Sequence, residues 1–227
     1  GLNTPLLIAG PCSAETQEQV VETGREIAKH GKAQVFRAGI WKPRTRPGSF
    51  EGIGEEGLKW MNEVKKETGM LLTTEVATTE HVELALKHGI DILWIGARTT
   101  VNPFSVQDIA DALKGVNIPV MVKNPINPDI ALWIGAMERL ANSGIDRVAA
   151  IHRGFSSFEK SPFRNAPMWE MGIELKTQFP NLDIICDPSH IAGTRELIPY
   201  VSQKALDLDM AGLMIETKVS LSSSSTG

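Results

Sequence analysis

The sequence predicts an α/β fold of the (β/α)8 barrel class. Three observations support this prediction: short apolar runs alternate with longer segments of helical period, the apolar runs are nearly continuous, and glycines follow the helical segments. Continuous apolar runs are typical of parallel strands that are covered on both faces. A glycine just past a helix provides the left-handed residue that ends it. Eight strands and seven intervening helices indicate a closed barrel, with a doubly wound open sheet as the alternative.

The individual elements follow from these patterns in chain order. The expected strands are 6–9, 34–38, 71–76, 92–95, 119–123, 147–152, 183–186 and 212–216. The expected helices are 16–30, 54–68, 79–88, 106–114, 129–143, 166–179 and 194–206. The glycines that follow helices are Gly31, Gly69, Gly89, Gly115 and Gly144.

The end of the chain departs from the barrel pattern. We expect one catalytic barrel over residues 1–217 and a Ser-rich tail over 218–227 that does not look native to it. Serine-rich segments have the composition of flexible linkers and do not pack as barrel helices. The eighth helix of the barrel is therefore expected to be missing or replaced.

Composition excludes several classes of protein. The net charge of −4 argues against a nucleic-acid-binding role, which needs a basic excess. No apolar run approaches the roughly 18 residues that a membrane helix requires, and no secretory signal is visible. Two cysteines do not make a disulfide framework for 227 residues. The expected location is the cytoplasm.

Ionisable side chains stand at the carboxyl ends of the expected strands, where barrels of this class carry their active sites. Six of them are cations: Arg37, Lys42, Arg44, Arg98, Lys123 and Arg153. A phosphate monoester carries about −1.5 to −2 charges near neutral pH, and guanidinium groups bind its oxygens in a bidentate manner. Pairing with acids across the barrel is the alternative for any single cation. Six together on an acidic chain favour a pocket for phosphorylated substrates.

Three possible metal ligands, Cys12, His190 and Glu216, stand at the ends of the first, seventh and eighth strands. These strands become neighbours when the barrel closes. A thiolate, an imidazole and a carboxylate together suit a first-row divalent ion. Cys186 lies inside an apolar run and is expected in the core.

The other histidines and aromatic residues are expected to be structural or exposed. His81 and His88 fall on or near a helix and are expected at the surface. Trp94 and Trp133 are expected to pack helices against the barrel, and Trp41 to line the pocket.

Together these motifs resemble those of the 3-deoxy-D-arabino-heptulosonate 7-phosphate (DAHP) synthases, over residues 6–216. The motifs are Gly-Pro-Cys-Ser at 10–13, Lys-Pro-Arg-Thr at 42–45, Ile-Gly-Ala-Arg at 95–98, Arg-Gly at 153–154 and Asp-Pro-Ser-His at 187–190. Lys-Pro-Arg-Thr distinguishes them from the related 3-deoxy-octulosonate 8-phosphate synthases. The sequence is most similar to the compact, barrel-only subgroup, which is often fused to chorismate mutase.

The resemblance implies condensation of phosphoenolpyruvate (PEP) with erythrose 4-phosphate, the first step of the shikimate pathway to aromatic amino acids. For PEP it implies Arg37, Glu75, Gly96, Ala97, Arg98, Lys123, Arg153 and His190. For the aldose phosphate it implies Lys42, Pro43, Arg44 and Thr45. The expected catalytic residues are Lys42, Glu75 and His190. The expected cofactor is a divalent metal (Mn, Fe, Zn or Co) on Cys12, His190 and Glu216; the family's fourth ligand, an aspartate, has no counterpart at 218–223.

In the expected mechanism, the metal polarises the aldehyde and the cations hold PEP against it. Water then adds, and Glu75 or His190 handles its proton. One alternative is an enzyme resembling the octulosonate or sialic acid synthases. Another is a catalytically impaired barrel that serves as partner of a chorismate mutase. A homo-oligomer is also expected.

Overall fold

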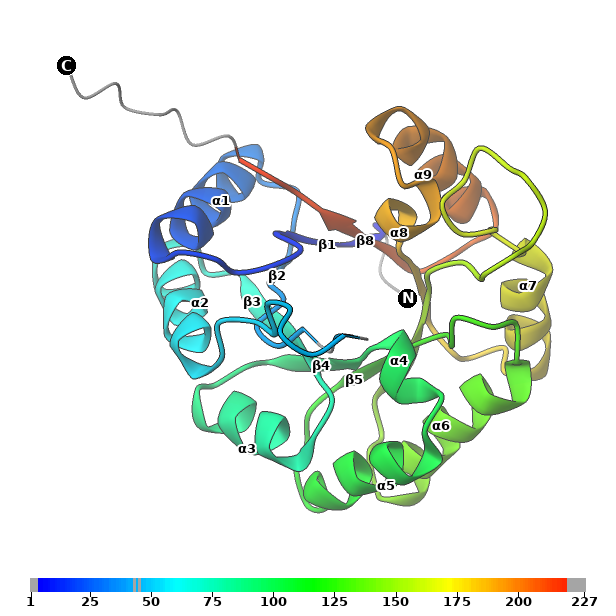
Figure 1. Ribbon diagram of the computed structural model, residues 1–227, viewed down its shortest axis with the longest axis horizontal. Helices are drawn as coiled ribbons and strands as arrows, with labels where there is room; N and C mark the ends of the chain where they lie inside the picture. The colour runs from blue at the N-terminus through cyan, green and yellow to red at the C-terminus, as the bar shows by residue number, and fades with distance from the viewer. Residues whose placement is uncertain (1–3, 43, 45, 220–227) are drawn as a thin grey trace.

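The strands of this chain close into a parallel barrel in a computed structural model that describes residues 4–42, 44 and 46–219 (Figure 1). They follow one another around the barrel in chain order, and β8 pairs with β1. The strands are β1 Leu6–Gly10, β2 Val35–Arg37, β3 Leu71–Val76, β4 Ile92–Ile95, β5 Val120–Lys123, β6 Val148–His152, β7 Ile184–Cys186 and β8 Gly212–Glu216. The predicted barrel is confirmed, and the open sheet is not.

Helices surround the barrel as an outer layer (Figure 1). They are α1 Gln17–His30, α2 Glu55–Thr68, α3 Thr79–Lys87, α4 Ala97–Thr100, α5 Pro103–Ala112, α6 Ile130–Asn142, α7 Trp169–Gln178, α8 Pro188–Ala192, the 3-10 helix η1 Arg195–Leu197 and α9 Ile198–Asp207. All seven predicted helical segments are present. The periodicity does not predict α4 and α8, because four or five residues are too few to show a helical period.

Local chemistry sets the ends of the helices. The Thr16 hydroxyl accepts from the Gln19 amide at 3.1 Å, and the Gln19 side chain returns a contact to the Thr16 backbone, forming a capping box before α1. Gly31 ends this helix with φ of 65°. Such caps satisfy backbone groups that the helix itself leaves unpaired.

The core has two layers. Inside the barrel lies a cluster to which most strands contribute one side chain, namely Ile8, Val35, Trp94, Met121, Ile151, Ile185 and Met214. A larger cluster, which includes the predicted Trp133 and Cys186, packs between the strands and the helices. The expectation for Trp94 is wrong. Its neighbours Leu93 and Ile95 face the helices, so strand alternation turns Trp94 into the barrel.

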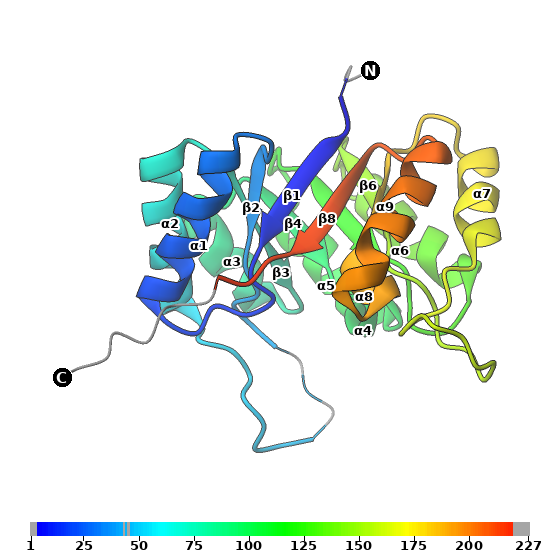
Figure 2. The same ribbon diagram turned by 90° about the horizontal axis from the view of Figure 1, so that it is seen from above.

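The loop after β2, residues 38–54, projects from the rim where the strands end (Figure 2). Its Pro43 and Thr45 lie outside the described residues, as do 220–227 of the predicted tail. Residues 217–219 follow β8 without regular structure. Within the described ranges, no helix is long and apolar enough to span a membrane.

Candidate active site

Two glycines allow the first two strand ends to approach each other. A Cβ atom on Gly10 would overlap the carbonyl oxygen of Arg37, and one on Gly39 would overlap that of Cys12. The absence of these side chains places Cys12 beside the β2 cations. The Lys42 ammonium donates to the Cys12 carbonyl and lies 3.4 Å from its Sγ.

Arg37 is a buried guanidinium, 2% exposed, at the end of β2. Its carbon Cζ lies 4.9 Å from the centre of the Trp94 ring, and Nη2 lies 3.8 Å from Oε1 of Glu216. Nε and Nη1 have no hydrogen-bond partner among the described residues. Because unpaired buried donors are costly, these nitrogens are suited to an incoming oxyanion.

Lys123, at the end of β5, is also buried. Its Nζ donates to Oδ2 of Asp187 at 2.9 Å and lies 5.7 Å from the centre of the Trp94 ring. Trp94 therefore lies within cation–π distance of two cations.

Arg153 follows β6 and is held at both its backbone and its side chain. Its amide donates to Oδ1 of Asn124 at 2.7 Å, and Nη1 donates to Oδ1 of Asn165 at 3.2 Å. Burial lowers the pKa of Arg153 against the opposing charge of Asp187, and the positive charges of Arg164 and Arg98 lower it further. Cations crowded in this way favour an anion between them.

Glu75 extends from β3 toward the start of α4. Its Oε1 accepts a hydrogen bond from the Trp94 indole at 3.1 Å. A Cβ atom on Gly96 would overlap this carboxylate, so the glycine provides the space it occupies. Gly96 precedes α4, whose first two residues are the half-buried Ala97 and the exposed Arg98.

The loop after β2 contacts α3 near its start, and Arg44 farther along it is exposed. Trp41 stacks on His81 with ring centres 4.1 Å apart, and its place in the pocket stays a prediction. His81 and His88 are half-buried, which corrects the expectation that they lie at the surface. Arg44 is exposed and donates to the Phe50 carbonyl within the same loop. The grouping of Arg44 with the other predicted cations stays a prediction.

The three predicted metal ligands are neighbours, but they do not form a closed cluster. His190 Nδ1 lies 3.7 Å from Oε1 of Glu216, and the Cys12 side chain is close enough to the same carboxyl group to help lower its pKa. Across residues 4–42, 44 and 46–219, no three His, Cys, Asp or Glu side chains are close enough together to hold an ion. Burial works to raise the pKa of Glu216, but the charges of Arg37 and His190 outweigh it and the net shift is downward.

Sequence reasoning did not assign a role to Asp187, although it lies in the Asp-Pro-Ser-His motif. This fully buried carboxylate contacts both Lys123 and His190. Burial works to raise the pKa of Asp187, but the contacts with His190 and Lys123 outweigh it and hold the pKa well below its ordinary range. The signal that could have marked Asp187 is its position directly after the seventh expected strand, where a carboxylate can cap a following helix and lie among other ionisable groups.

Asn124 and Asn165 were not predicted either. Asn165 connects Arg153 to the carbonyl of His190, to which its Nδ2 donates at 2.6 Å. No local pattern marks this asparagine, because it reaches the site from the long loop between β6 and α7.

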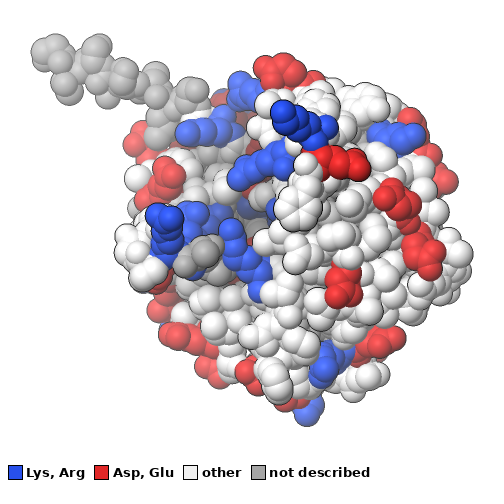
Figure 3. All heavy atoms as spheres, turned by 45° about the vertical axis from the view of Figure 1, so that its right-hand side comes forward, with Lys and Arg blue, Asp and Glu red and all other residues white. Residues whose placement is uncertain are grey.

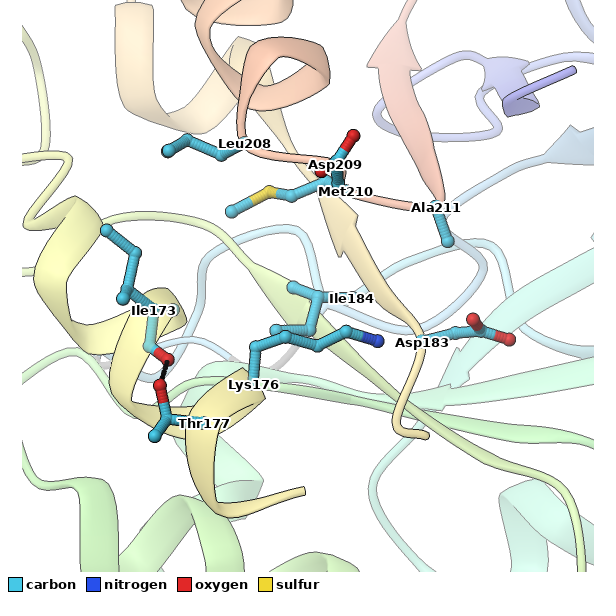
Figure 4. Close-up of a pocket in the computed structure, with 10 residues that line it drawn as sticks. Ile173, Lys176, Thr177, Asp183, Ile184, Leu208, Asp209, Met210 and Ala211 are labelled. Carbon is cyan, nitrogen blue, oxygen red and sulfur yellow. Dashed lines mark hydrogen bonds between the residues drawn. The ribbon is translucent and has the colours of Figure 1, made fainter. Parts of the chain in front are cut away.

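Lys and Arg side chains gather around a hollow on the face seen in Figure 3, with most Asp and Glu side chains farther out. A separate cavity of about 230 Å3 lies where β7 and β8 begin, next to α7 (Figure 4). Lys176, Asp183, Asp209 and Met210 line it, and the described lining includes none of the predicted site residues. This cavity therefore lies apart from the strand-end residues described above.

Comparison with known proteins agrees with this arrangement. The model of the DAHP synthetase I family matches residues 1–225. The phospho-2-dehydro-3-deoxyheptonate aldolase of Thermotoga maritima is 33% identical over 210 residues, which is 92% of this chain and 60% of that protein. The 2-dehydro-3-deoxyphosphooctonate aldolase of Dechloromonas aromatica is 27% identical, over 96% of this chain and 82% of that protein.

Solved structures give the same result. A crystal structure of the Thermotoga maritima DAHP synthase has a TM-score of 0.82 at 32% identity, covering 93% of this chain and 59% of that one. A truncated form of that synthase has a TM-score of 0.81 at 30% identity, covering 96% and 77%. The chain thus spans about three fifths of the full-length relative. The barrel, the strand-end residues and these matches together show that the chain belongs to the DAHP synthetase I family.

Proposed function

We propose that this barrel condenses PEP with erythrose 4-phosphate to give DAHP and inorganic phosphate. The observation that carries the proposal is the convergence of Arg37, Lys123 and Arg153 around one rim. Arg37 keeps two buried nitrogens without partners among the described residues. A phosphate and a carboxylate on one small molecule would satisfy these donors.

The proposed PEP site comprises these three cations with Glu75, Gly96, Ala97, Arg98 and His190. Lys42 and Arg44, together with Pro43 and Thr45, are proposed to hold the aldose phosphate. Holding both substrates in one pocket brings the reacting carbons together, an effect that supplies about 7–11 kcal/mol in favourable cases.

We propose Glu75 and His190 as the groups that handle the proton of the water added during the reaction. Glu75 accepts a hydrogen bond from Trp94 at Oε1 and is half-buried, and its Oε2 is the oxygen proposed to meet the water. His190 is also half-buried, 26% exposed at its side chain. Lys42 is the proposed cation beside the aldehyde, because it reaches the rim at Cys12.

The donor set of Cys12, His190 and Glu216 fits a divalent first-row metal (Mn, Fe, Zn or Co). Oε1 of Glu216 is buried without a hydrogen-bond donor among the described residues, which leaves it available to a cation. The Lys42 ammonium lies 3.4 Å from Cys12 Sγ and must move aside for an ion. A bound ion would act as a Lewis acid on the aldehyde oxygen.

The second candidate is an octulosonate-type synthase, since relatives of that name share about a quarter of their residues with this chain. The test measures phosphate released from PEP in the presence of erythrose 4-phosphate or arabinose 5-phosphate, with Mn²⁺ added. Release that depends on erythrose 4-phosphate is expected, and chelation should abolish it. Preference for arabinose 5-phosphate would favour the second candidate, and PEP binding without turnover would favour the impaired barrel.

A further inference from the structure

Asn165 lies half-buried in the long loop between β6 and α7, and both ends of its side-chain amide are hydrogen-bonded. Its Nδ2 donates to the His190 carbonyl at 2.6 Å, and its backbone amide donates to the Ile191 carbonyl at 3.3 Å. These two bonds attach Asn165 to α8. Its Oδ1 accepts from Nη1 of Arg153 at 3.2 Å, so the same side chain also holds a cation of the proposed PEP site.

The guanidinium of Arg153 bonds to the protein through one nitrogen. Nη1 donates to Oδ1 of Asn165 and to the Gly154 carbonyl, each at 3.2 Å, whereas Nε and Nη2 make no hydrogen bond with the described residues. Nε and Nη2 form one edge of the planar group, and such an edge matches two oxygens of a phosphate or a carboxylate. Holding Nη1 on the protein therefore leaves this edge for a ligand.

We propose that Asn165 is a positioning residue that fixes the Arg153 guanidinium so that its Nε–Nη2 edge binds an oxyanion of PEP. This inference rests on the proposed function, in which Arg153 contacts PEP. Asparagine supplies a neutral acceptor. It restrains the cation without neutralising the charge that attracts PEP, as an aspartate at this position would.

Arg153 needs such a restraint because other cations lie near it. Burial and the charges of Arg164 and Arg98 lower the pKa of Arg153, so these two cations repel its guanidinium. An arginine side chain also has many rotamers, and selecting one of them before binding reduces the entropy that is lost on binding. Without Asn165, both effects favour rotamers other than the one that binds PEP.

The backbone around Arg153 is held by contacts that do not involve the Asn165 side chain. The Arg153 amide donates to Oδ1 of Asn124 at 2.7 Å. Farther along the loop, Phe155 and Ala166 exchange backbone hydrogen bonds of 2.9 and 2.8 Å. Loss of the Asn165 amide should therefore release the guanidinium while the strand end and the base of the loop stay in place.

Asn165→Leu removes both hydrogen bonds of the amide with little change in volume. It should weaken PEP binding about 10-fold, the effect of losing one hydrogen bond to a charged group. In an Arg153→Ala background the same substitution should have almost no further effect, because the group that Asn165 positions is absent. Titration calorimetry with PEP on wild type, both single variants and the double variant measures this coupling.

The matched control is Asn62→Leu. Asn62 is also half-buried and donates to two carbonyls, those of Leu58 and His88, but it lies on α2 and reaches the end of α3, at the rim where the strands begin. This substitution should lower the melting temperature, as Asn165→Leu does, and leave the affinity for PEP as in wild type.

A second measurement needs no substrate. It records ¹⁵N relaxation of the Arg153 Nε–H group, whose signal is identified by its loss in Arg153→Lys. The order parameter should be near the rigid value of about 0.85 in wild type and below about 0.6 in Asn165→Leu. If Asn165→Leu does not fold, Asn165→Ser replaces it in both measurements.

A mobile Arg153 guanidinium in wild type would overturn the proposal. So would an equally rigid guanidinium in the folded Asn165 variant, or losses of PEP affinity that simply add in the double variant. Wild type that binds no PEP would count against the proposed function, and the relaxation data would still decide whether Asn165 fixes Arg153.

Discussion

The charged residues of this site each contact specific neighbours. Lys123 pairs with Asp187 and lies near Trp94, while Arg37 lies over the same ring and near Glu216. Removing one member of a buried pair leaves the other without compensation and costs more than the pair itself contributes. Substitutions at these positions should therefore affect binding much more than substitutions of exposed charges.

We expect Arg153→Ala to weaken PEP binding by about 2–5 kcal/mol, the cost of losing one buried charge-assisted contact. Titration calorimetry measures this directly. Arg139→Ala removes an exposed arginine from the last turn of α6 and should bind PEP as wild type does. Equal affinity of Arg153→Ala and Arg139→Ala would remove Arg153 from the site.

The two cysteines form a natural pair for comparison. Cys12 is exposed at the rim, whereas Cys186 is buried in the core, where burial raises the pKa of its thiol well above the ordinary value. Cys12→Ser should abolish metal-stimulated turnover, because a hydroxyl is a poor ligand for these ions. Cys186→Ser should keep turnover and lose about 1–3 kcal/mol of unfolding free energy, because it buries a hydroxyl. Metal-stimulated activity that survives in Cys12→Ser would contradict the assignment.

Whole elements position the site through their ends. The loop after β2 carries Lys42 and Arg44. Near the start of this loop, Trp41 stacks on His81 of α3. His81 is itself tied to the base of α3, where its Nδ1 accepts from the Ala77 amide at 3.1 Å. The pair therefore anchors a long loop close to the point where it leaves the barrel.

Trp41→Ala should raise the KM for the aldose phosphate while leaving the affinity for PEP nearly unchanged. The loop would lose this contact. Binding of the aldose phosphate would then have to order the loop, and the free-energy cost of that ordering would weaken the binding. Trp41→Phe keeps an aromatic face for stacking and should retain most of the affinity. A change in the KM for PEP alone would show that the loop contributes to binding of PEP and not of the aldose phosphate.

Over the whole molecule, stability is coupled to pH through a side chain that faces away from the site. His152 is fully buried, its Nε2 lies 2.6 Å from the Pro167 carbonyl, and burial lowers its pKa from 6.5 to about 4. The unfolded chain thus takes up this proton first as pH falls. The contribution of His152 to stability is complete above about pH 6.5 and is lost as pH falls toward 4.

We expect wild type to lose about 3 kcal/mol of unfolding free energy through His152 over this pH range. The measurement compares urea unfolding of wild type and His152→Phe between pH 7 and about 4 in the presence of chelator. The variant loses the Pro167 contact, so its free energy of unfolding should be lower at pH 7. That free energy should also change less with pH than in wild type. His30→Gln, an exposed control, should follow wild type. Parallel curves for wild type and His152→Phe would refute the coupling.

The sequence by itself determined the barrel and the rim that carries its polar residues. Segments such as 71–76, 92–95 and 212–216 are observed as strands with the predicted ends, because apolar pattern and turn residues act over a few neighbours. Once eight parallel strands are assigned, closure brings all their carboxyl ends to one rim. Arg37, Lys123 and Arg153 were therefore predictable as neighbours.

Only the tertiary structure decided how these charges are paired. Asp187 contacts both Lys123 and His190, and Asn165 connects Arg153 to His190. Trp94 lies within cation–π distance of two cations. Apart from the contact between Asp187 and His190, these contacts join strands and loops that are far apart in the chain. The face of a strand that turns inward depends on register, and a one-residue change reverses it. Pairing is set by distances of a few ångströms across the closed barrel, which no local sequence pattern encodes.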